Sequence, residues 1–150
     1  MKYKCEVTID LPRDAVIALF KNLEFRPVWQ EGLTRIENIE GIAFEVNAVH
    51  QYHFMMKNKE MIIKETILEQ HFPDYISAMY VSSGVENIST DEFISKPNHS
   101  TTYVSEQEFY SNKLFYRLLF IFMPSMFKRE TQKTLNAFKS FCEGHDLNTD

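Results

Sequence analysis

The chain has 150 residues, of which 44% are apolar, and it carries a formal net charge of −5 from 16 basic and 21 acidic residues. This length is typical of a single domain that buries a substantial core without disulfide bonds. The acidic balance argues against nucleic acid as the main partner, because phosphate binding needs clustered lysines and arginines. The one basic pair, Lys128 and Arg129, is interpreted as solvated helix surface.

The two cysteines, Cys5 and Cys142, lie near opposite ends of the chain. We expect two buried, reduced thiols, and the sequence leaves a disulfide between them open as the alternative. The first residues lack the apolar core of a signal peptide, and the apolar run over residues 114–123 is about half the length of a membrane-spanning helix. These features predict a soluble, cytoplasmic protein without stable membrane insertion.

The first third of the chain predicts a strand followed by two short helices. Residues 2–11 alternate between apolar and polar side chains, which is typical of a half-buried strand. Pro12 ends this strand, and apolar residues at spacings of three and four predict a helix over residues 13–22. The aromatic connector over residues 25–32, which holds the only tryptophan, predicts a second short helix or turn.

Six further strands are predicted from alternation and from bounding turn residues. They cover residues 33–40, 43–54, 60–70, 75–81, 85–95 and 101–110. All four glycines fall at the ends of predicted elements, which makes the assignment internally consistent. The connections between these strands are short, so we expect an antiparallel meander.

One long helix is predicted over residues Lys113 to Glu143. Its residues recur at spacings of three and four along one face, and Pro124 predicts a kink because it lacks a backbone N–H. The apolar residues Leu114, Leu118 and Ile121 lie away from that face. Burial under the sheet rim or loops, a homodimer contact, and a mobile gate touching membrane or lipid are the three alternatives for them.

This order of elements resembles the helix-grip fold of the START-like superfamily, which includes plant pollen allergens, lipid-transfer domains and polyketide cyclases. The bacterial cyclase/dehydrase-like branch, often labelled SRPBCC, is the most similar. The resemblance rests on segments 11–16, 27–33, 101–109 and 122–128 and covers nearly the whole chain. It implies one α+β domain over residues 1–150, in which a seven-stranded curved antiparallel sheet wraps around the C-terminal helix and leaves a cavity between them. It implies no particular reaction, because carriers, enzymes and regulators share this fold.

A cavity of this kind is lined by the inward faces of strands and helix, and a filled core without a cavity is the alternative. A lining that is mostly aromatic with a few polar groups is typical of small-molecule sites. The predicted ligand-binding residues are Trp29, Phe44, Val46, His50, Tyr52, Phe54, Tyr103, Ser105, Gln107, Phe109, Phe120, Met123 and Phe127.

His50 and Tyr103 are the candidate catalytic residues. An ionisable His50 on an apolar strand face is suited to acid–base chemistry, and a hydrogen-bonded core histidine is the alternative. His53 falls three residues later and therefore on the opposite face, so the two histidines cannot share a metal. No metal motif is present and no cofactor is expected.

For two other sets of polar residues, the sequence pattern says less about which way the side chains point. Glu106 and Glu108 share one strand face, which we expect to point outward as a solvated pair. Asn87, Ser89 and Asp91 share a face whose direction the sequence does not settle, and the same is true of residues 60–70.

The leading functional hypothesis is a non-enzymatic binder of a small hydrophobic molecule: a lipid, isoprenoid, quinone or polyketide. The alternative is an enzyme similar to polyketide cyclases or aromatases, in which His50 or Tyr103 polarises a carbonyl or moves a proton. A third hypothesis is a protein-interaction module that uses the apolar helix segment. The expected partner is the small hydrophobic molecule, and a homodimer with a second copy of the chain is a further option.

Overall fold

Seven strands form a single antiparallel sheet in the computed structural model, which describes residues 1–145. Strands β2 to β7 follow one another as a meander, and the last of them, β7, also pairs with β1. This arrangement confirms the predicted antiparallel sheet. The strands are β1 (Lys2–Ile9), β2 (Leu33–Glu40), β3 (Val49–Met56), β4 (Lys59–His71), β5 (Tyr75–Ser82), β6 (Val85–Ser95) and β7 (Thr101–Ser111).

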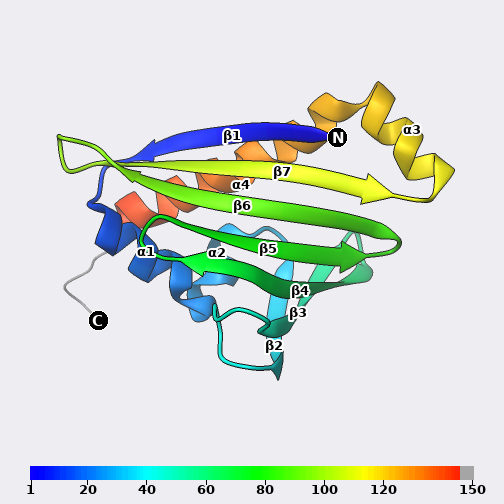
Figure 1. The fold of residues 1–150 in the computed structure, drawn as a ribbon, viewed down its shortest axis with the longest axis horizontal. Helices are drawn as coiled ribbons and strands as arrows, with labels where there is room; N and C mark the ends of the chain where they lie inside the picture. The colour runs from blue at the N-terminus through cyan, green and yellow to red at the C-terminus, as the bar shows by residue number, and fades with distance from the viewer. Residues whose placement is uncertain (146–150) are drawn as a thin grey trace.

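The helices lie at the two ends of the strand series. After β1 come α1 (Arg13–Lys21), the 3₁₀ turn η1 (Leu23–Phe25) and α2 (Arg26–Trp29), and after β7 come α3 (Leu114–Phe122) and α4 (Pro124–Gly144). Figure 1 shows α4 running along one face of the sheet next to β1, with α1 and α2 at one end of that face. The curved sheet around a long C-terminal helix is the predicted helix-grip arrangement.

An aromatic cluster joins α1, the sheet and α4 at the centre of the core. The Phe20 ring centroid lies 5.1 Å from that of Phe93. The ring of Phe138, on α4, lies 4.7 Å from Trp29 and 5.7 Å from Tyr103. Phe138 is fully buried, so ring contacts with the sheet and with α2 hold α4 in place.

Both cysteines are buried and free, which confirms the expected reduced thiols. Burial raises the pKa of Cys142 to about 12 and raises the pKa of Cys5 above its ordinary value. The thiol is therefore the form present at neutral pH, and since the thiolate is the reactive form, neither side chain is suited to nucleophilic chemistry.

The predicted single helix from Lys113 to Glu143 is wrong, because the chain forms two helices at this point. Met123 separates them with φ −131° and ψ 45°, outside the helical region. The ring of Pro124 disfavours a helical conformation at the residue before it and removes one backbone donor. Pro124 instead occupies the first turn of α4, where the missing N–H costs nothing.

The predicted strand over residues 43–54 is also shorter than expected, since β3 begins at Val49. Residues 41–48 form a loop in which Phe44 and Asn47 adopt φ values of 68° and 71°. The loop returns to the sheet where the Asn47 N–H donates to the carbonyl of Ile67 at 2.9 Å. Phe44 is buried against Phe20 rather than aligned along a strand, so the alternation of apolar residues here reflects a folded loop.

The outward face of helix α3 is exposed, and the first of the three alternatives for Leu114, Leu118 and Ile121, burial under the sheet rim or loops, is therefore wrong. Leu114, Leu118 and Ile121 are all exposed, and no residue of α3 is buried. In Figure 1, α3 stands out beyond the end of β7. Within residues 1–145, no helix combines the length and the apolar character needed to cross a bilayer.

Replacement of Phe138 by alanine tests the ring contacts that hold α4. We expect a loss of about 3–5 kcal/mol in the free energy of unfolding, because the cavity left behind is enclosed by other rings. Urea denaturation followed by circular dichroism measures this value. Phe115→Ala removes the same side chain from the exposed face of α3 and should change stability by no more than about 0.5 kcal/mol. Similar losses in both variants would contradict the assignment of the core.

Candidate functional site

A cavity of about 330 Å³ lies between the sheet and α4. The strands contribute one wall, the middle of α4 contributes the opposite wall, and α2 closes one end. Its principal lining residues are Phe20, Arg26, Trp29, Tyr52, Phe54, Tyr80, Asn87, Ser89, Asp91, Tyr103, Ser105, Gln107, Phe109, Thr131, Thr134 and Leu135.

The wall formed by β6 and β7 is polar and internally hydrogen-bonded. The register places Ser89 opposite Gln107 and Asp91 opposite Ser105, so the polar side chains of the two strands meet in pairs. The Gln107 Nε2 amide donates to Ser89 Oγ at 2.8 Å and to Ser105 Oγ at 2.7 Å. Tyr103 donates its hydroxyl to Asp91 Oδ1 at 2.9 Å.

Burial dominates the titration of Asp91. It raises the pKa of this carboxyl above its ordinary value, although hydrogen bonds from Ser105, Tyr103 and Ser89 and the charge of Arg26 all act to lower it. Asp91 therefore takes up a proton at a higher pH than an exposed aspartate does.

A buried guanidinium lies at the end of the cavity closed by α2. Arg26 donates from Nη1 to the Tyr52 hydroxyl at 3.2 Å and from Nη2 to the Phe20 carbonyl at 3.4 Å. The Tyr52 hydroxyl donates in turn to Glu65 Oε2 at 3.1 Å, and Tyr80 donates to the same oxygen at 2.8 Å. The cation and the carboxyl group are thus linked through a tyrosine rather than by a direct salt bridge.

Aromatic rings enclose the same guanidinium. Its central carbon lies 4.6 Å from the ring centroid of Phe20 and 5.2 Å from that of Trp29. Burial acts to lower the pKa of Arg26, but the oxygens of Tyr52, Tyr80 and Glu65 raise it overall, so the side chain stays charged. Cation–π contact supplies part of the stabilisation that water gives an exposed arginine.

Two buried N–H donors in this region have no acceptor among the described residues. They are Nε of Arg26 and Nε1 of Trp29, and both side chains line the cavity. Both nitrogens are shielded from solvent and are donors only, so only an acceptor that reaches them, from water or from a bound molecule, would satisfy them. This pair of unsatisfied donors is the chemical feature that most restricts what the cavity can hold.

Seven of the predicted ligand-binding residues line this cavity. They come from α2, β3 and β7, and alternation in the sequence placed those of β3 and β7 on the inward face. They are Trp29, Tyr52, Phe54, Tyr103, Ser105, Gln107 and Phe109.

The other six predicted lining residues lie elsewhere. Phe44 is in the core, and Val46, in the same loop, is 52% exposed. Met123 is exposed at the break between the helices. Phe120 and Phe127 lie on the side of Phe109 that faces α3, with centroid distances of 5.9 and 5.4 Å from its ring.

His50, the sixth, is buried behind the cavity. Its Nδ1 lies 3.7 Å from Oε1 of Glu65, which is longer than a hydrogen bond, and it finds no other partner among the described residues. It does not line the cavity. Of the two candidate catalytic residues, only Tyr103 reaches the site.

Sequence reasoning missed Arg26 and Glu65, and left Asn87, Ser89 and Asp91 undecided. No local pattern marks the first two, because their partners come from distant strands. For the other three a signal was present: Phe93 continues the same alternation and is apolar, which favours an inward face. The structure places all of them inside.

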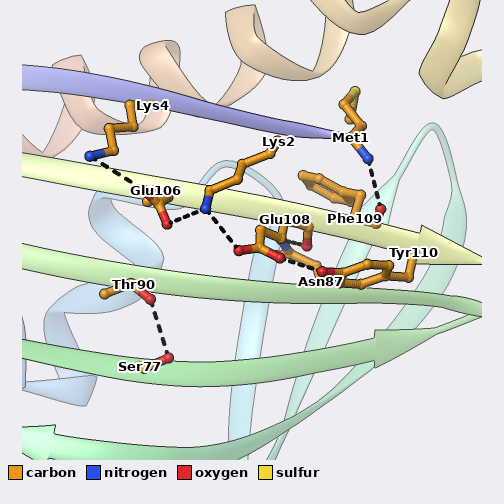
Figure 2. A network of polar contacts seen from close by, with 10 residues as sticks. All are labelled: Met1, Lys2, Lys4, Ser77, Asn87, Thr90, Glu106, Glu108, Phe109 and Tyr110. Atoms are coloured by element: carbon orange, nitrogen blue, oxygen red, sulfur yellow. Dashed lines mark hydrogen bonds and ion pairs between the residues drawn. The ribbon is translucent and has the colours of Figure 1, made fainter.

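The carboxylates predicted to face outward do so. Lys2 Nζ lies 3.2 Å from Glu106 and 3.3 Å from Glu108, and Lys4 Nζ lies 3.3 Å from Glu106. Figure 2 shows this network on the outer face of β1 and β7. The pair therefore has no part in the cavity. Among residues 1–145, no group of side chains is arranged to hold a metal ion.

These features define a helix-grip protein with a cavity between the sheet and α4, and solved structures confirm the fold. The aromatase/cyclase ZhuI from Streptomyces sp. R1128 superposes with a TM-score of 0.77 at 14% identity, covering 95% of this chain and 93% of that one. Ara h 8.0201 gives a TM-score of 0.76 at 13% identity, covering 97% and 99%. The ginseng major latex-like protein 151 from Panax ginseng gives 0.73 at 13% identity, covering 93% and 95%.

The predicted resemblance to the START-like superfamily is thus confirmed at the level of the fold. A scan of the sequence against protein-family models finds no match, and a comparison with curated protein sequences finds none either.

The raised pKa of Asp91 predicts a characteristic pH dependence of stability. A carboxyl whose folded-state pKa is raised binds more protons in the folded state, so wild-type stability falls as the pH rises from the unfolded to the folded pKa. Asp91→Asn cannot titrate, so wild-type stability should fall relative to this variant as the pH rises above the ordinary aspartate pKa of about 4. Urea unfolding at a series of pH values measures the difference.

Glu108→Gln is the matched control for that experiment. The hydrogen bonds from Tyr110 and Lys2 lower the pKa of Glu108. The stability that the Glu108 carboxylate contributes to the folded state is therefore lost as the pH falls. Wild-type stability should therefore rise with pH relative to Glu108→Gln. If the difference in unfolding free energy between wild type and variant changed with pH in the same direction for both variants, the burial of Asp91 would be contradicted.

Proposed function

We propose that the protein binds a small, largely apolar molecule that presents a neutral carbonyl group to Arg26 and Trp29. The observation that carries this proposal is the pair of buried, unsatisfied N–H donors in the cavity wall. Leaving a buried donor unpaired costs about 1–3 kcal/mol, and a ligand oxygen that accepts from it recovers this cost. A carbonyl oxygen has two lone pairs and no proton of its own, so it is an acceptor suited to such donors.

The rest of the ligand is expected to be apolar. Rings of Phe20, Tyr52, Phe54 and Phe109 contribute to the lining, and the volume of about 330 Å³ is at the small end of the range for ligand sites. Each Å² of apolar ligand surface removed from water contributes about 25 cal/mol. The cavity therefore suits a molecule with one or two fused rings better than a long acyl chain.

A neutral carbonyl is favoured over a carboxylate because of the charges already present. One guanidinium, that of Arg26, shares the cavity region with two carboxyl groups, those of Glu65 and Asp91. A ligand carboxylate would add a third acidic group, and the other cation of the lining, Lys133, is already paired with Glu31. Among the ligand classes predicted from the sequence, quinones and polyketides meet this requirement, whereas free fatty acids do not.

A second candidate function is acid–base catalysis on such a carbonyl compound. Asp91 has a raised pKa and lines the cavity together with Tyr103, so it is suited to exchanging a proton with a bound ligand. An aromatase/cyclase from Streptomyces has the same fold. Under this alternative, Asp91→Asn should bind a polyketide substrate but lose most of its turnover. Under simple carriage, the wild type should bind the substrate and release it unchanged.

Nuclear magnetic resonance tests the carbonyl contact directly, because Trp29 is the only tryptophan and gives a single indole N–H resonance. Three probes of nearly equal size serve: 1-acetonaphthone, 1-ethylnaphthalene and 1-naphthoate. The ketone should move the indole proton downfield, as a new hydrogen bond does, and the hydrocarbon should not. Isothermal titration should rank the ketone tightest and the carboxylate weakest.

The variant Trp29→Phe supplies the control. It keeps an aromatic wall but removes one donor, so the preference for ketone over hydrocarbon should fall by about fivefold to tenfold. Affinity for the hydrocarbon should be nearly unchanged. Equal affinities for all three probes, or an indole resonance that the ketone does not move, would overturn the proposed recognition.

A further inference from the structure

The outward face of α3 is apolar from one end of the helix to the other. Five apolar side chains lie on one side of this helix. They belong to Leu114 and to the residues one, four, seven and eight positions after it, which together span about 120° around the helix axis and so form one continuous strip. All are exposed, and Ile121 and Phe122 reach 68% and 77%. The strip consists of Leu114, Phe115, Leu118, Ile121 and Phe122, and Met123 and Met126 extend it.

The charged residues in the segment that carries this strip are all basic. From Phe109 to Arg129 the chain has four basic residues and no aspartate or glutamate, although the whole chain carries a net charge of −5. The four are Lys113, Arg117, Lys128 and Arg129. Among the described residues, none of them forms a salt bridge, and Lys113 donates only to the backbone carbonyl of Ser83.

The carboxylates just before this segment do not offset that positive charge. Glu106 and Glu108, on the outer face of β7, are already paired with Lys2 and Lys4 (Figure 2). The end of the molecule from which α3 projects (Figure 1) therefore combines exposed apolar side chains with basic residues that form no salt bridge among the described residues.

We propose that α3 binds the surface of an anionic lipid bilayer, with its apolar strip among the acyl chains and its basic residues at the headgroups. Amphipathic helices that lie in the membrane interface combine these two features. A second copy of the chain fits less well, because two such segments in contact would bring eight basic residues together without an acidic one.

The dimensions of α3 agree with binding in the interface rather than across the bilayer. Its nine residues make a helix of about 14 Å, less than half of the roughly 30 Å hydrocarbon core. The break at Met123 directs the chain out of this helix and into α4, which is held against the sheet. The strip can therefore contact lipid while the rest of the domain stays in water.

The bilayer site also lies beside the cavity. Phe120, on the inner side of α3, contacts Phe109, and Phe109 lines the cavity. A molecule leaving the bilayer would thus be one side chain away from the internal site. The membrane proposal does not depend on the proposed ligand, because it is tested with the unliganded protein.

Co-sedimentation of the full chain with lipid vesicles tests the proposal. Vesicles with about 30 mol % phosphatidylserine should bind the protein at least about tenfold more tightly than phosphatidylcholine alone. Raising the salt from about 0.1 M to 0.5 M should weaken binding, because it screens the basic residues. Arg117→Gln should lower affinity for the anionic vesicles by about fivefold.

A matched pair of substitutions separates lipid contact from a general effect of added charge. Ile121→Glu places a carboxylate in the strip and should lower vesicle binding at least about tenfold. Ile42→Glu makes the same change at an equally exposed site, 66% against 68%, in the loop before β3, and should keep wild-type binding within about twofold. The thermal unfolding midpoint of each variant shows that it is folded.

Three results would overturn the proposal. The first is no binding to either kind of vesicle, and the second is equal, salt-independent binding to both. The third is a dimer in sedimentation equilibrium that Ile121→Glu dissociates, without vesicle binding, which would assign the strip to a second copy of the chain.

Discussion

A positive charge buried among aromatic rings is the constraint on which the rest of the cavity depends. Only 2% of the Arg26 surface is exposed, and removing a guanidinium from water costs several kcal/mol unless the protein replaces its hydration. The ring of Phe20, the hydroxyl of Tyr52 and, through it, the carboxyl of Glu65 supply that replacement. A well-packed apolar core would be at least as stable. The chemical effect of the charge is instead to keep the cavity polar at one end.

The two faces of β7 show how one strand serves two environments. Ser105 and Gln107 point inward and bond within the polar wall, whereas Glu106 and Glu108 point outward and pair with lysines on β1. Because strand side chains alternate, each requirement is met without disturbing the other. The sequence pattern predicted this division correctly, as it did for β1, since both strands are regular and bury one face only.

Prediction from sequence was less successful where the structure depends on distant residues. The loop over residues 41–48 alternates like a strand, yet positive φ values at Phe44 and Asn47 turn it back on the core. The network around Arg26 joins residues 26, 52, 65 and 80, and no local periodicity connects them. The facing of half the site could be predicted from alternation, but the charges that give it its chemistry could not.

The pairing of β1 with β7 has a consequence for the newly made protein. Tyr3 bonds to Thr131 on α4 at 2.7 Å, a contact that spans 128 residues of sequence. The first strand leaves the ribosome early but has no neighbour until β7 has been made. The concave face of the meander, with its buried arginine site, likewise stays uncovered until α4 emerges. The nascent chain therefore leaves the future wall of the cavity uncovered until its last helix has been made.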